Sequence, residues 1–251
     1  MVLINQTLFQ NIENAISEVV PKKKIGIAFS GGVDSTLVSK ICTDMGYDVI
    51  LLTIGFSQSH DIEFSKEVNQ FLNYSHHILE IDPDTFPKIT TDIHKVINTD
   101  NLSWNENCIA FYYVSKLAKS LNLDTVITGN GIDELFCGYN AYREAFTGGE
   151  TKINQVMDLK LDNELKMMKA VNVIASEFDV KILQPLLSPK FIEYAKTVPI
   201  SEKILSSDDL YRKHIIRKLA IEVGVPELSC NKRKKALQYG SKIHKSLLKT
   251  R

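Results

Sequence analysis

The sequence has few of the features that mark a membrane protein or a secreted one. Its four cysteines lie far apart in 251 residues without a Cys-x-x-Cys pair, which argues against a zinc ribbon and a disulfide framework. The N-terminal segment MVLINQTLFQNIENAI places Asn, Gln and Glu among its apolar residues, so it lacks the unbroken apolar run of a signal peptide or a membrane span. We therefore expect a soluble, cytoplasmic protein without a membrane partner.

A net charge is also absent. The 30 basic and 30 acidic residues cancel, which argues against a protein whose main task is to bind a long phosphate backbone, although a local basic patch stays open. With 44% hydrophobic residues, the chain can bury a substantial core and fits one large domain or two small ones. A disordered chain is not expected, and nucleic acid is not an expected partner.

Hydrophobic periodicity in the first half alternates between that of strands and that of helices. Short runs rich in β-branched and apolar residues lie at 24–30, 47–56, 75–82 and 123–130. Longer segments with helical spacing, such as DSTLVSKICTDMG, separate these runs. Near-continuous apolar runs such as VILLTI suit parallel strands that are buried on both faces. The pattern predicts an α/β fold with a doubly wound, mostly parallel sheet and right-handed crossovers.

From about residue 139 onward the strand signal almost vanishes. The segments at 153–178 and 208–224 repeat apolar residues at helical spacing. We therefore expect three parts: an N-terminal helix at 1–20, an α/β core at 21–145 and a helical subdomain at 146–251 that completes the active site.

The stretch IAFSGGVDST at 27–36 has the composition of an anion-binding loop. Ser30, Gly31 and Gly32 follow the first predicted strand, at the edge of the sheet where this fold class binds ligands. The glycines allow a sharp turn and a close approach of a ligand, while the N–H groups that open the next helix can donate to an anion. Phosphate is the anion that best suits this loop.

Asp34 and Ser35 follow the glycines, where a carboxylate repels a phosphate unless a cation lies between them. Mg²⁺ would remove the conflict, because it prefers carboxylate and phosphate oxygens. Alternatively, Asp34 only stabilises the first turn of its helix, as acids at helix N-termini do by roughly 0.3 to 1 kcal/mol. No Gly-Lys-Ser/Thr follows, so the segment is not a Walker A loop.

SGGVDS at 30–35 resembles the PP-loop of the ATP pyrophosphatases, enzymes that split ATP between its α- and β-phosphates to give AMP and pyrophosphate. The resemblance implies the adenine nucleotide alpha hydrolase-like fold of that superfamily, with residues 21–145 as the nucleotide-binding core. It says little about the second substrate, because amide synthetases, nucleotide synthetases and tRNA thiolases share the motif.

A second motif, TGNGIDELFCGYNAYR at 128–143, follows the fourth predicted strand. It has the same order of features as the first motif, because glycines at a strand end are followed by acids. Two glycines flank Asn130, and Asp133 and Glu134 come next. Two acids at two strand ends can share one metal. The alternative is an ordinary helix start that packs its aromatic residues in the core.

The second motif resembles the Ser-Gly-Glu-Gly-x-Asp-Glu-x-Phe-x-Gly-Tyr signature of the asparagine synthetase and β-lactam synthetase family. The resemblance implies that Asp34 and Asp133 hold Mg²⁺ on the pyrophosphate of ATP. It also implies that backbone groups at Ile54 read adenine. The nucleotide-binding residues implied in this way are Phe29, Ser30, Gly31, Gly32, Asp34, Ser35, Ile54, Thr128 and Gly129.

The segment NKRKKALQYGS at 231–241 resembles the Arg-x-Lys segment that supplies the catalytic lysine of that family, and Arg233 and Lys235 occupy the matching positions. With Asp133, they are the residues to which the resemblance assigns catalysis. A lysine there can neutralise charge that develops between the α-phosphate and the attacked carboxylate. Residues 231–251 carry basic side chains and no acid, so a solvated basic helix and a nucleic-acid patch are the alternatives.

The resemblance covers roughly residues 20–245 and implies an AMP-forming amide synthetase. A substrate carboxylate attacks the α-phosphate, pyrophosphate leaves with Mg²⁺, and a nitrogen nucleophile displaces AMP. The chain begins Met1-Val2, without the glutaminase domain of the usual glutamine-hydrolysing enzymes. We therefore expect the nitrogen to come from ammonia, an amine substrate or a separate glutaminase subunit, and a homo-oligomer stays open.

Three residues depart from the family pattern. Asn130 replaces the acid of the signature, which removes a candidate proton acceptor. Leu183 and Ser188 stand where the family has the Arg and Asp of Arg-x-Pro-Phe-Leu-Asp. These departures leave the carboxylate substrate open. The alternative functions are a PP-loop tRNA- or nucleotide-modifying enzyme and a catalytically inactive nucleotide-binding subunit.

Overall fold

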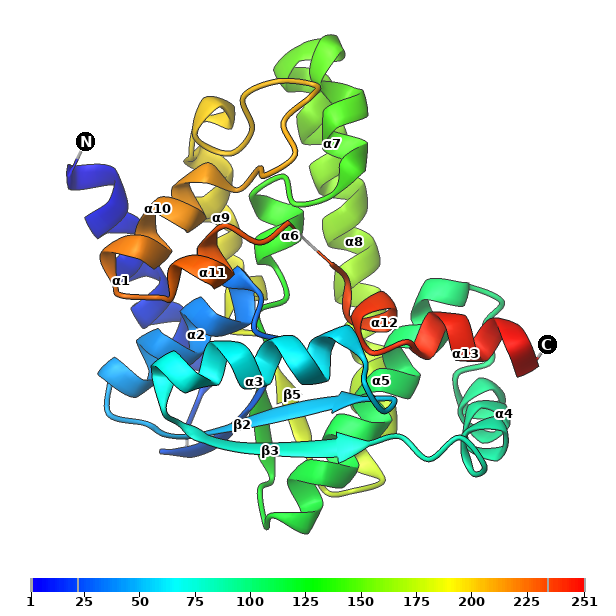
Figure 1. The fold of residues 1–251 in the computed structure, drawn as a ribbon. Helices are drawn as coiled ribbons and strands as arrows, with labels where there is room; N and C mark the ends of the chain where they lie inside the picture. The colour runs from blue at the N-terminus through cyan, green and yellow to red at the C-terminus, as the bar shows by residue number, and fades with distance from the viewer. Residues whose placement is uncertain (1, 22, 234, 251) are drawn as a thin grey trace.

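The sheet of this protein is parallel, five-stranded and ordered β3-β2-β1-β4-β5. The computed structural model, shown in Figure 1, describes residues 2–21, 23–233 and 235–250. The strands are β1 (Lys24–Ala28), β2 (Asp48–Gly55), β3 (Ser75–Glu80), β4 (Thr125–Ile127) and β5 (Lys181–Leu183). The doubly wound α/β fold predicted from the sequence is confirmed, as are the four strands expected in the first half.

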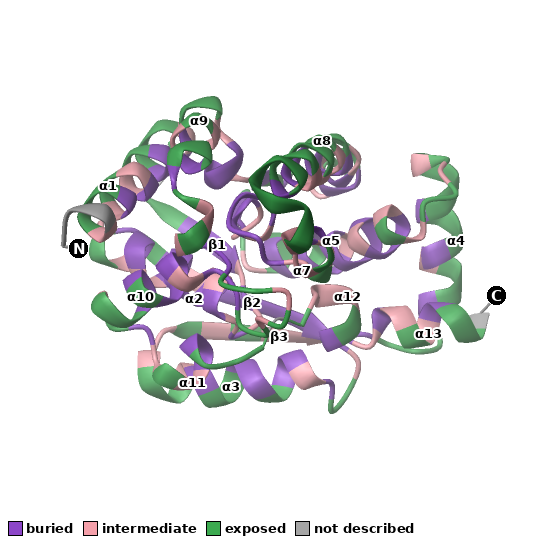
Figure 2. Cartoon of the chain, turned by 90° about the horizontal axis from the view of Figure 1, so that it is seen from above, coloured by how far each residue is buried: buried purple, intermediate pink, exposed green. Residues whose placement is uncertain are grey.

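Helices cover both faces of the sheet. Five of the longer helices follow the first strand, namely α2 (Val33–Asp44), α3 (His60–Leu72), α4 (Phe86–Ile97), α5 (Leu102–Ser120) and α8 (Gly149–Ser176). Right-handed crossovers place α2 and α3 on one face, and α5 and α8 on the other, as Figure 2 shows from above. The chain leaves β1 and β4, which are neighbours, toward opposite faces, and this opens a crevice at their carboxyl ends.

The remaining elements are short, apart from the N-terminal helix. They are α1 (Val2–Val19), α6 (Ile132–Leu135), α7 (Asn140–Ala145), η1 (Phe146–Gly148), η2 (Pro185–Leu187), α9 (Pro189–Thr197), η3 (Ile200–Glu202), α10 (His214–Glu222), α11 (Glu227–Cys230), α12 (Leu237–Gly240) and α13 (Ile243–Thr250). Helix α1 contacts α2, α9 and α10, whereas the chain after α11 crosses the molecule so that α12 and α13 contact α5 (Figure 1). The end of the chain thus lies beside the carboxyl end of β2, where the Phe56 N–H donates to the Ser241 carbonyl at 3.0 Å.

Apolar burial explains why the predicted strands form. Ile25 and Ile27 are fully buried in the central strand β1, as are Val126 in β4 and Leu51 in β2 on either side of it. Each such side chain contributes roughly 1.5 to 3 kcal/mol when it leaves water. The four cysteines are buried and free, as expected from their spacing. None of the described helices combines the length and the apolar character that a membrane span requires.

Two features of the second half differ from the sequence pattern. The three-residue strand β5 pairs in parallel with β4, so the sheet continues beyond residue 145, and the division at 1–20, 21–145 and 146–251 stays a prediction. Helix α10 begins at His214 and not near 208, because a turn held by the Asp209 side chain precedes it.

Candidate active site

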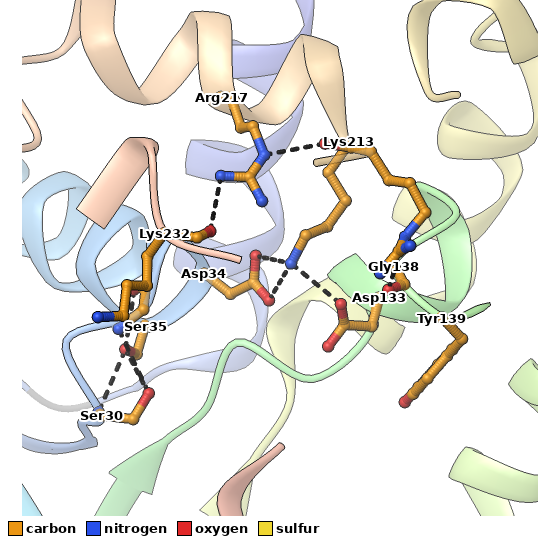
Figure 3. A network of polar contacts seen from close by, with 12 residues as sticks. Ser30, Asp34, Ser35, Asp133, Gly138, Tyr139, Lys213, Arg217 and Lys232 are labelled. Carbon is orange, nitrogen blue, oxygen red and sulfur yellow. Dashed lines mark hydrogen bonds and ion pairs between the residues drawn. The ribbon is translucent and has the colours of Figure 1, made fainter. Parts of the chain in front are cut away.

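The loop between β1 and α2 lies at the crevice. Gly31 has a φ of 77°, a conformation that favours glycine, and a Cβ there would lie 3.0 Å from the Phe64 ring. The Ser35 hydroxyl donates to the Gly32 carbonyl at 3.2 Å and lies 3.5 Å from the Ser30 hydroxyl (Figure 3). The two hydroxyls thus meet at the N-terminus of α2, where the helix dipole favours an anion.

The loop between β4 and α6 packs directly on the first loop. A Cβ on Gly129 would lie 3.2 Å from the Cβ of Asp34, tighter than most such contacts. A Cβ on Gly138 would lie 1.9 Å from the Oδ1 atom of Asp133, so this glycine makes room for the carboxylate. Two glycines of the second motif therefore allow Asp34 and Asp133 to approach each other from different strand ends.

A lysine that the sequence did not single out lies between the two carboxylates. Its Nζ atom donates to the two carboxylate oxygens of Asp34 at 2.8 and 2.7 Å, and to Oδ1 of Asp133 at 3.0 Å (Figure 3). This residue is Lys213, whose side chain is only 2% exposed, so solvent screens the ion pairs little. The two acids are therefore close enough to share one cation.

The backbone that presents Lys213 is strained. Arg212 and Lys213 have left-handed φ angles of 49° and 53°, which cost non-glycine residues about 1 to 3 kcal/mol each. The Asp209 carboxylate supports the turn by accepting from the N–H groups of Arg212 at 2.9 Å and Leu205 at 3.0 Å. Burial acts to raise the pKa of Asp209, but these bonds and one to His214 lower it to about 2. Asp209 thus stays ionised and keeps the turn in place.

Arg217 connects α10 to the segment that follows α11. Its guanidinium donates to the carbonyl of Lys232 at 3.1 Å and to that of Cys230, and the residue is 7% exposed. The Ser229 hydroxyl in α11 donates to the Gly31 carbonyl at 2.7 Å. The tail, by which we mean residues 231–238, is therefore bonded to α10 through Lys232, and α11, which precedes it, is bonded to the first glycine loop through Ser229.

The two loops, the tail, α5 and α8 enclose a cavity of about 260 Å³. We call two parts of its lining the loop wall and the helix wall. The loop wall comprises residues of the first glycine loop and the start of α2 (Ala28, Phe29, Ser30, Gly32, Val33, Asp34 and Ser35), and Thr128, Gly129 and Asp133 of the second. It also includes Leu52 and Ile54 of β2 and the tail residues Lys232, Arg233, Lys235, Ala236, Leu237 and Gln238. The helix wall comprises Ser103, Asn107, Phe111 and Val114 of α5, Lys160, Asn163, Glu164 and Met167 of α8, and Asn130, Glu134 and Tyr139.

Polar side chains of the helix wall are bonded to one another. The Asn130 amide donates to Oε1 of Glu164 at 2.5 Å, and the Tyr139 hydroxyl donates to Oε1 of Glu134. Burial raises the pKa of Tyr139 well above its ordinary value, and the charges of Glu134, Asp133 and Glu164 act in the same direction. The Tyr139 phenol therefore stays protonated and remains a donor.

All but one of the site residues predicted from the sequence line the cavity. They are Phe29, Ser30, Gly32, Asp34, Ser35, Ile54, Thr128, Gly129, Asp133, Arg233 and Lys235. Gly31 stands behind the wall, where its carbonyl accepts from Ser229. Arg233 and Lys235 are exposed on the tail, on either side of Lys234, which lies outside the described residues. The structure thus brings together residues from both motifs and the basic tail.

Among the lining residues that sequence reasoning did not single out are three charged side chains with buried contacts, Lys213, Arg217 and Glu164. Lys213 and Arg217 belong to a segment with helical spacing, in which basic residues four apart are typical of a solvated face. Glu164 did carry a signal, because it falls between Leu161 and Met168 in the apolar stripe of α8, where a charged side chain is rarely buried unless it is paired.

The donor atoms around Lys213 also bear on metal binding. Within the described part of the chain, no three His, Cys, Asp or Glu side chains form a group that could hold a metal ion alone. Two carboxylates do fit Mg²⁺ when phosphate oxygens and water complete the coordination. Because the Lys213 ammonium already occupies the carboxylates, a divalent cation there requires both a phosphate ligand and a shift of Lys213.

The chain was also compared with known proteins and families. Residues 10–170 match the family model described as asparagine synthase. Over 260 residues the chain is 26% identical to a Methanocaldococcus jannaschii protein named as a glutamine-hydrolysing asparagine synthetase, covering 90% of this chain and 47% of that protein. Asparagine synthetase 1 of Arabidopsis thaliana is 25% identical over 218 residues, covering 82% of this chain and 37% of that enzyme. The chain thus spans less than half the length of these curated relatives.

Solved structures were compared as well. The NMN synthetase from Francisella tularensis aligns with a TM-score of 0.47 and 16% identity, covering 94% of this chain and 75% of that one.

Proposed function

This chain belongs to the asparagine synthase family, and from that premise we propose that it is an ATP-dependent, AMP-forming amide synthetase. In this proposal it adenylates a substrate carboxylate and then transfers the acyl group to ammonia or an amine. One observation carries the proposal: two glycine loops meet in one cavity, where Asp34 and Asp133 both bind the ammonium of Lys213.

The loop wall is suited to a nucleotide. The N-terminus of α2 and the hydroxyls of Ser30 and Ser35 offer donors for the phosphates of ATP. Phe29 and Ile54 are 3% and 2% exposed at the ends of β1 and β2, where they provide an apolar surface for the adenine ring. Thr128 and Gly129 line the same wall from the second loop. These contacts support ATP as the nucleotide.

We assign Asp34 and Asp133 to a Mg²⁺ ion that accompanies the pyrophosphate. When bound, this ion neutralises negative charge on the leaving pyrophosphate. The carboxylates are held in place by Lys213 until the nucleotide arrives, and the displaced ammonium can then turn toward the phosphates. Lys213 would then donate to the phosphates, and the two carboxylates would be left to hold the ion.

Lys235 and Arg233 supply the remaining positive charge. Both line the cavity from the exposed tail, so they can approach a ligand without disturbing buried contacts. We propose that Lys235 neutralises charge on the α-phosphate as the carboxylate oxygen attacks it and the bond to the β-phosphate breaks. Catalysis then rests on positioning and charge neutralisation, and no side chain needs to form a covalent intermediate.

The nitrogen donor is proposed from the family rather than from the cavity. Ammonia, an amine substrate and ammonia delivered by a separate glutaminase subunit all suit the reaction. The departures at Asn130, Leu183 and Ser188 leave the carboxylate to be found by experiment.

A panel assay tests the proposal. The protein is incubated with ATP, Mg²⁺, ammonia and a series of small carboxylates, and both nucleotide products are quantified. We expect AMP and pyrophosphate in equal amounts with at least one carboxylate. Formation of ADP would contradict the proposal. Turnover that depends on added tRNA would instead support a modifying enzyme, and tight ATP binding without turnover would support an inactive nucleotide-binding subunit.

A further inference from the structure

A buried carboxylate lies behind the tail, outside the lining of the cavity. Asp61 belongs to the first turn of α3 and is 2% exposed. Its Oδ1 atom lies 3.2 Å from Nδ1 of His60, whereas its buried Oδ2 atom has no hydrogen-bond partner in the described part of the chain. Burial of a carboxylate is costly when one of its oxygens is unpaired, so the position calls for a role beyond packing.

The chain that follows the tail fits closely against this carboxylate. A Cβ on Gly240, in α12, would lie 1.9 Å from Oδ1 and 2.3 Å from Oδ2 of Asp61, so a glycine is required for the two segments to approach in this way. A backbone bond holds them together, because the Phe56 N–H donates to the Ser241 carbonyl at 3.0 Å. Helix α12 therefore packs on the first turn of α3, and the two lie side by side in Figure 1.

The start of the tail contacts the same helix about one turn further along. The Lys232 ammonium lies 4.4 Å from the centroid of the Phe64 ring, and that ring also packs against Gly31 of the first glycine loop. The tail thus contacts α3 at its start and, through Gly240, just beyond its end. Because α3 itself packs on the glycine loop, these contacts fix the intervening Lys235 relative to the proposed phosphate site.

Charge connects Asp61 to Lys235 as well. Burial raises the pKa of Asp61 above its ordinary value, whereas the hydrogen bond and charge of His60, and then the charge of Lys235, act to lower it. The Lys235 ammonium is therefore near enough to attract the carboxylate, and the burial of Asp61 limits the screening of this attraction by solvent.

We propose that Asp61 is a positioning residue for Lys235. This inference rests on the proposed amide synthetase function, in which Lys235 neutralises charge on the α-phosphate. Asp61 does not line the cavity, but its carboxylate attracts the lysine and packs against Gly240, so that the tail stays on α3 and Lys235 stays at the cavity. The alternative is that Asp61 only stabilises the N-terminus of α3, as acids in a first helical turn do.

The first test is a double-mutant cycle of Asp61→Asn with Lys235→Ala, in which kcat for pyrophosphate release is measured with the best carboxylate of the panel. Asparagine keeps the size of the side chain and removes its charge. We expect Asp61→Asn alone to lower kcat by about 10-fold and to leave the affinity for ATP unchanged, because a displaced group loses part of its effect. In the Lys235→Ala background, the same substitution should change kcat by less than about twofold.

A merely structural Asp61 would behave differently in this cycle. Its substitution would lower kcat to the same degree whether or not Lys235 is present, since a loosened fold does not depend on that lysine. Glu63→Gln, an exposed change on the same helix, is the matched control and leaves kcat unaltered in both backgrounds.

The second test displaces α12 and keeps the carboxylate. In Gly240→Ala the added methyl group meets Asp61, so α12 must move away from α3. We expect a similar loss in kcat, about 10-fold, and again no further loss in the Lys235→Ala background. This variant decides the question if Asp61→Asn does not fold.

Hydrogen exchange provides a measurement that needs no turnover. The N–H groups of Gly240 and Ser241 donate to carbonyls one turn earlier in α12. Local opening of α12 exposes these donors, so we expect them to exchange at least about tenfold faster in Asp61→Asn than in the unaltered protein or in Glu63→Gln.

The inference is wrong if Asp61→Asn keeps full kcat or lowers it equally with and without Lys235. It is also wrong if exchange in α12 is unchanged in both Asp61→Asn and Gly240→Ala. In each of these cases the synthetase function stands. Absence of pyrophosphate release from the unaltered protein with every carboxylate contradicts the synthetase function instead, and hydrogen exchange then still shows whether Asp61 holds the tail in place.

Discussion

The two walls of the cavity are built in different ways. The loop wall depends on backbone geometry in short contiguous motifs, in which glycines let Asp34 and Asp133 approach each other. The helix wall depends on side chains such as Asn107 and Glu164 that come from separate helices. The proposed nucleotide site is therefore readable in the sequence, because strand ends and glycines are local features, whereas the proposed acceptor site depends on long-range packing.

Substitution of the two carboxylates that bind Lys213 should give the largest effect and should show most clearly how the roles of the two walls differ. In Asp34→Asn and Asp133→Asn, the loss of one charge removes a proposed Mg²⁺ ligand and leaves buried Lys213 with a single carboxylate. We expect pyrophosphate release to fall by about 1000-fold, at the upper end for loss of a group that stabilises developing charge. Release is measured with the best carboxylate of the panel. Selective loss of amide formation, with adenylation intact, would contradict this role of the loop wall.

Lys235→Ala should show a smaller effect that is confined to chemistry. Lys235 is exposed on the tail, so its truncation should leave the fold and the affinity for ATP unchanged. We expect kcat to fall by about 100-fold, as for one lost group that stabilises the transition state. Stopped-assay turnover and equilibrium ATP binding are measured in parallel. Lys245→Ala, an exposed change in α13, serves as the control, and full activity of Lys235→Ala would exclude the residue from catalysis.

Ser229→Ala tests how far the loop wall depends on the tail. The substitution removes the donor to the Gly31 carbonyl, and Ser229 is fully buried. An unsatisfied buried carbonyl costs about 1 to 3 kcal/mol, which we expect as a loss in the free energy of unfolding by urea. Ser201→Ala, at an exposed position, should change this free energy little. Equal stability of the two variants would show that the tail is not anchored through Gly31.

The smallest effect is expected from His76 in β3, as a dependence of stability on pH. The Thr53 hydroxyl donates to the Phe29 carbonyl at 2.7 Å and contacts Nε2 of His76 at 2.8 Å. Burial, followed by the charges of His77 and Lys66, lowers the pKa of His76 from 6.5 to about 4. Between pH 6.5 and 4 His76 is protonated in the unfolded chain but neutral in the folded chain. The free energy of unfolding therefore falls as the pH drops from 6.5 toward 4.

Urea unfolding at several pH values measures this dependence. His76→Gln should flatten the profile within the window, whereas His77→Gln, an exposed change on the same strand, should reduce its slope only in part, because burial is the larger cause of the His76 shift. An unchanged slope in His76→Gln would assign the pH dependence to other groups.

The sequence predicts the parts of the fold in which hydrophobic pattern and length agree. VILLTI is long and apolar enough to indicate a buried parallel strand, and it forms most of β2. The three residues of β5 carry no such pattern, since a strand this short is defined only by its pairing with β4. Helix α10 has the expected period, but its start depends on the side-chain bonds of Asp209, which periodicity does not report.

The candidate site divides in the same way. The predicted residues Asp34 and Asp133 meet because neighbouring parallel strands end at the same edge of the sheet. Lys213 lies 179 residues beyond Asp34 in the sequence. The left-handed residues of its turn are Arg212 and Lys213 themselves, so no glycine marks the turn in the sequence. Its ion pairs exist only once the helices have packed, so no local spacing could have indicated them.

The position of the tail sets an order in time. A ribosome delivers both glycine loops well before residues 231–238 emerge, and the sheet can begin to fold in that interval. A polypeptide that stopped at Cys230 would retain both acids but would lack the tail side chains that line the cavity, Lys235 among them. A polypeptide truncated there is therefore expected to show little turnover of ATP, although it contains both glycine loops.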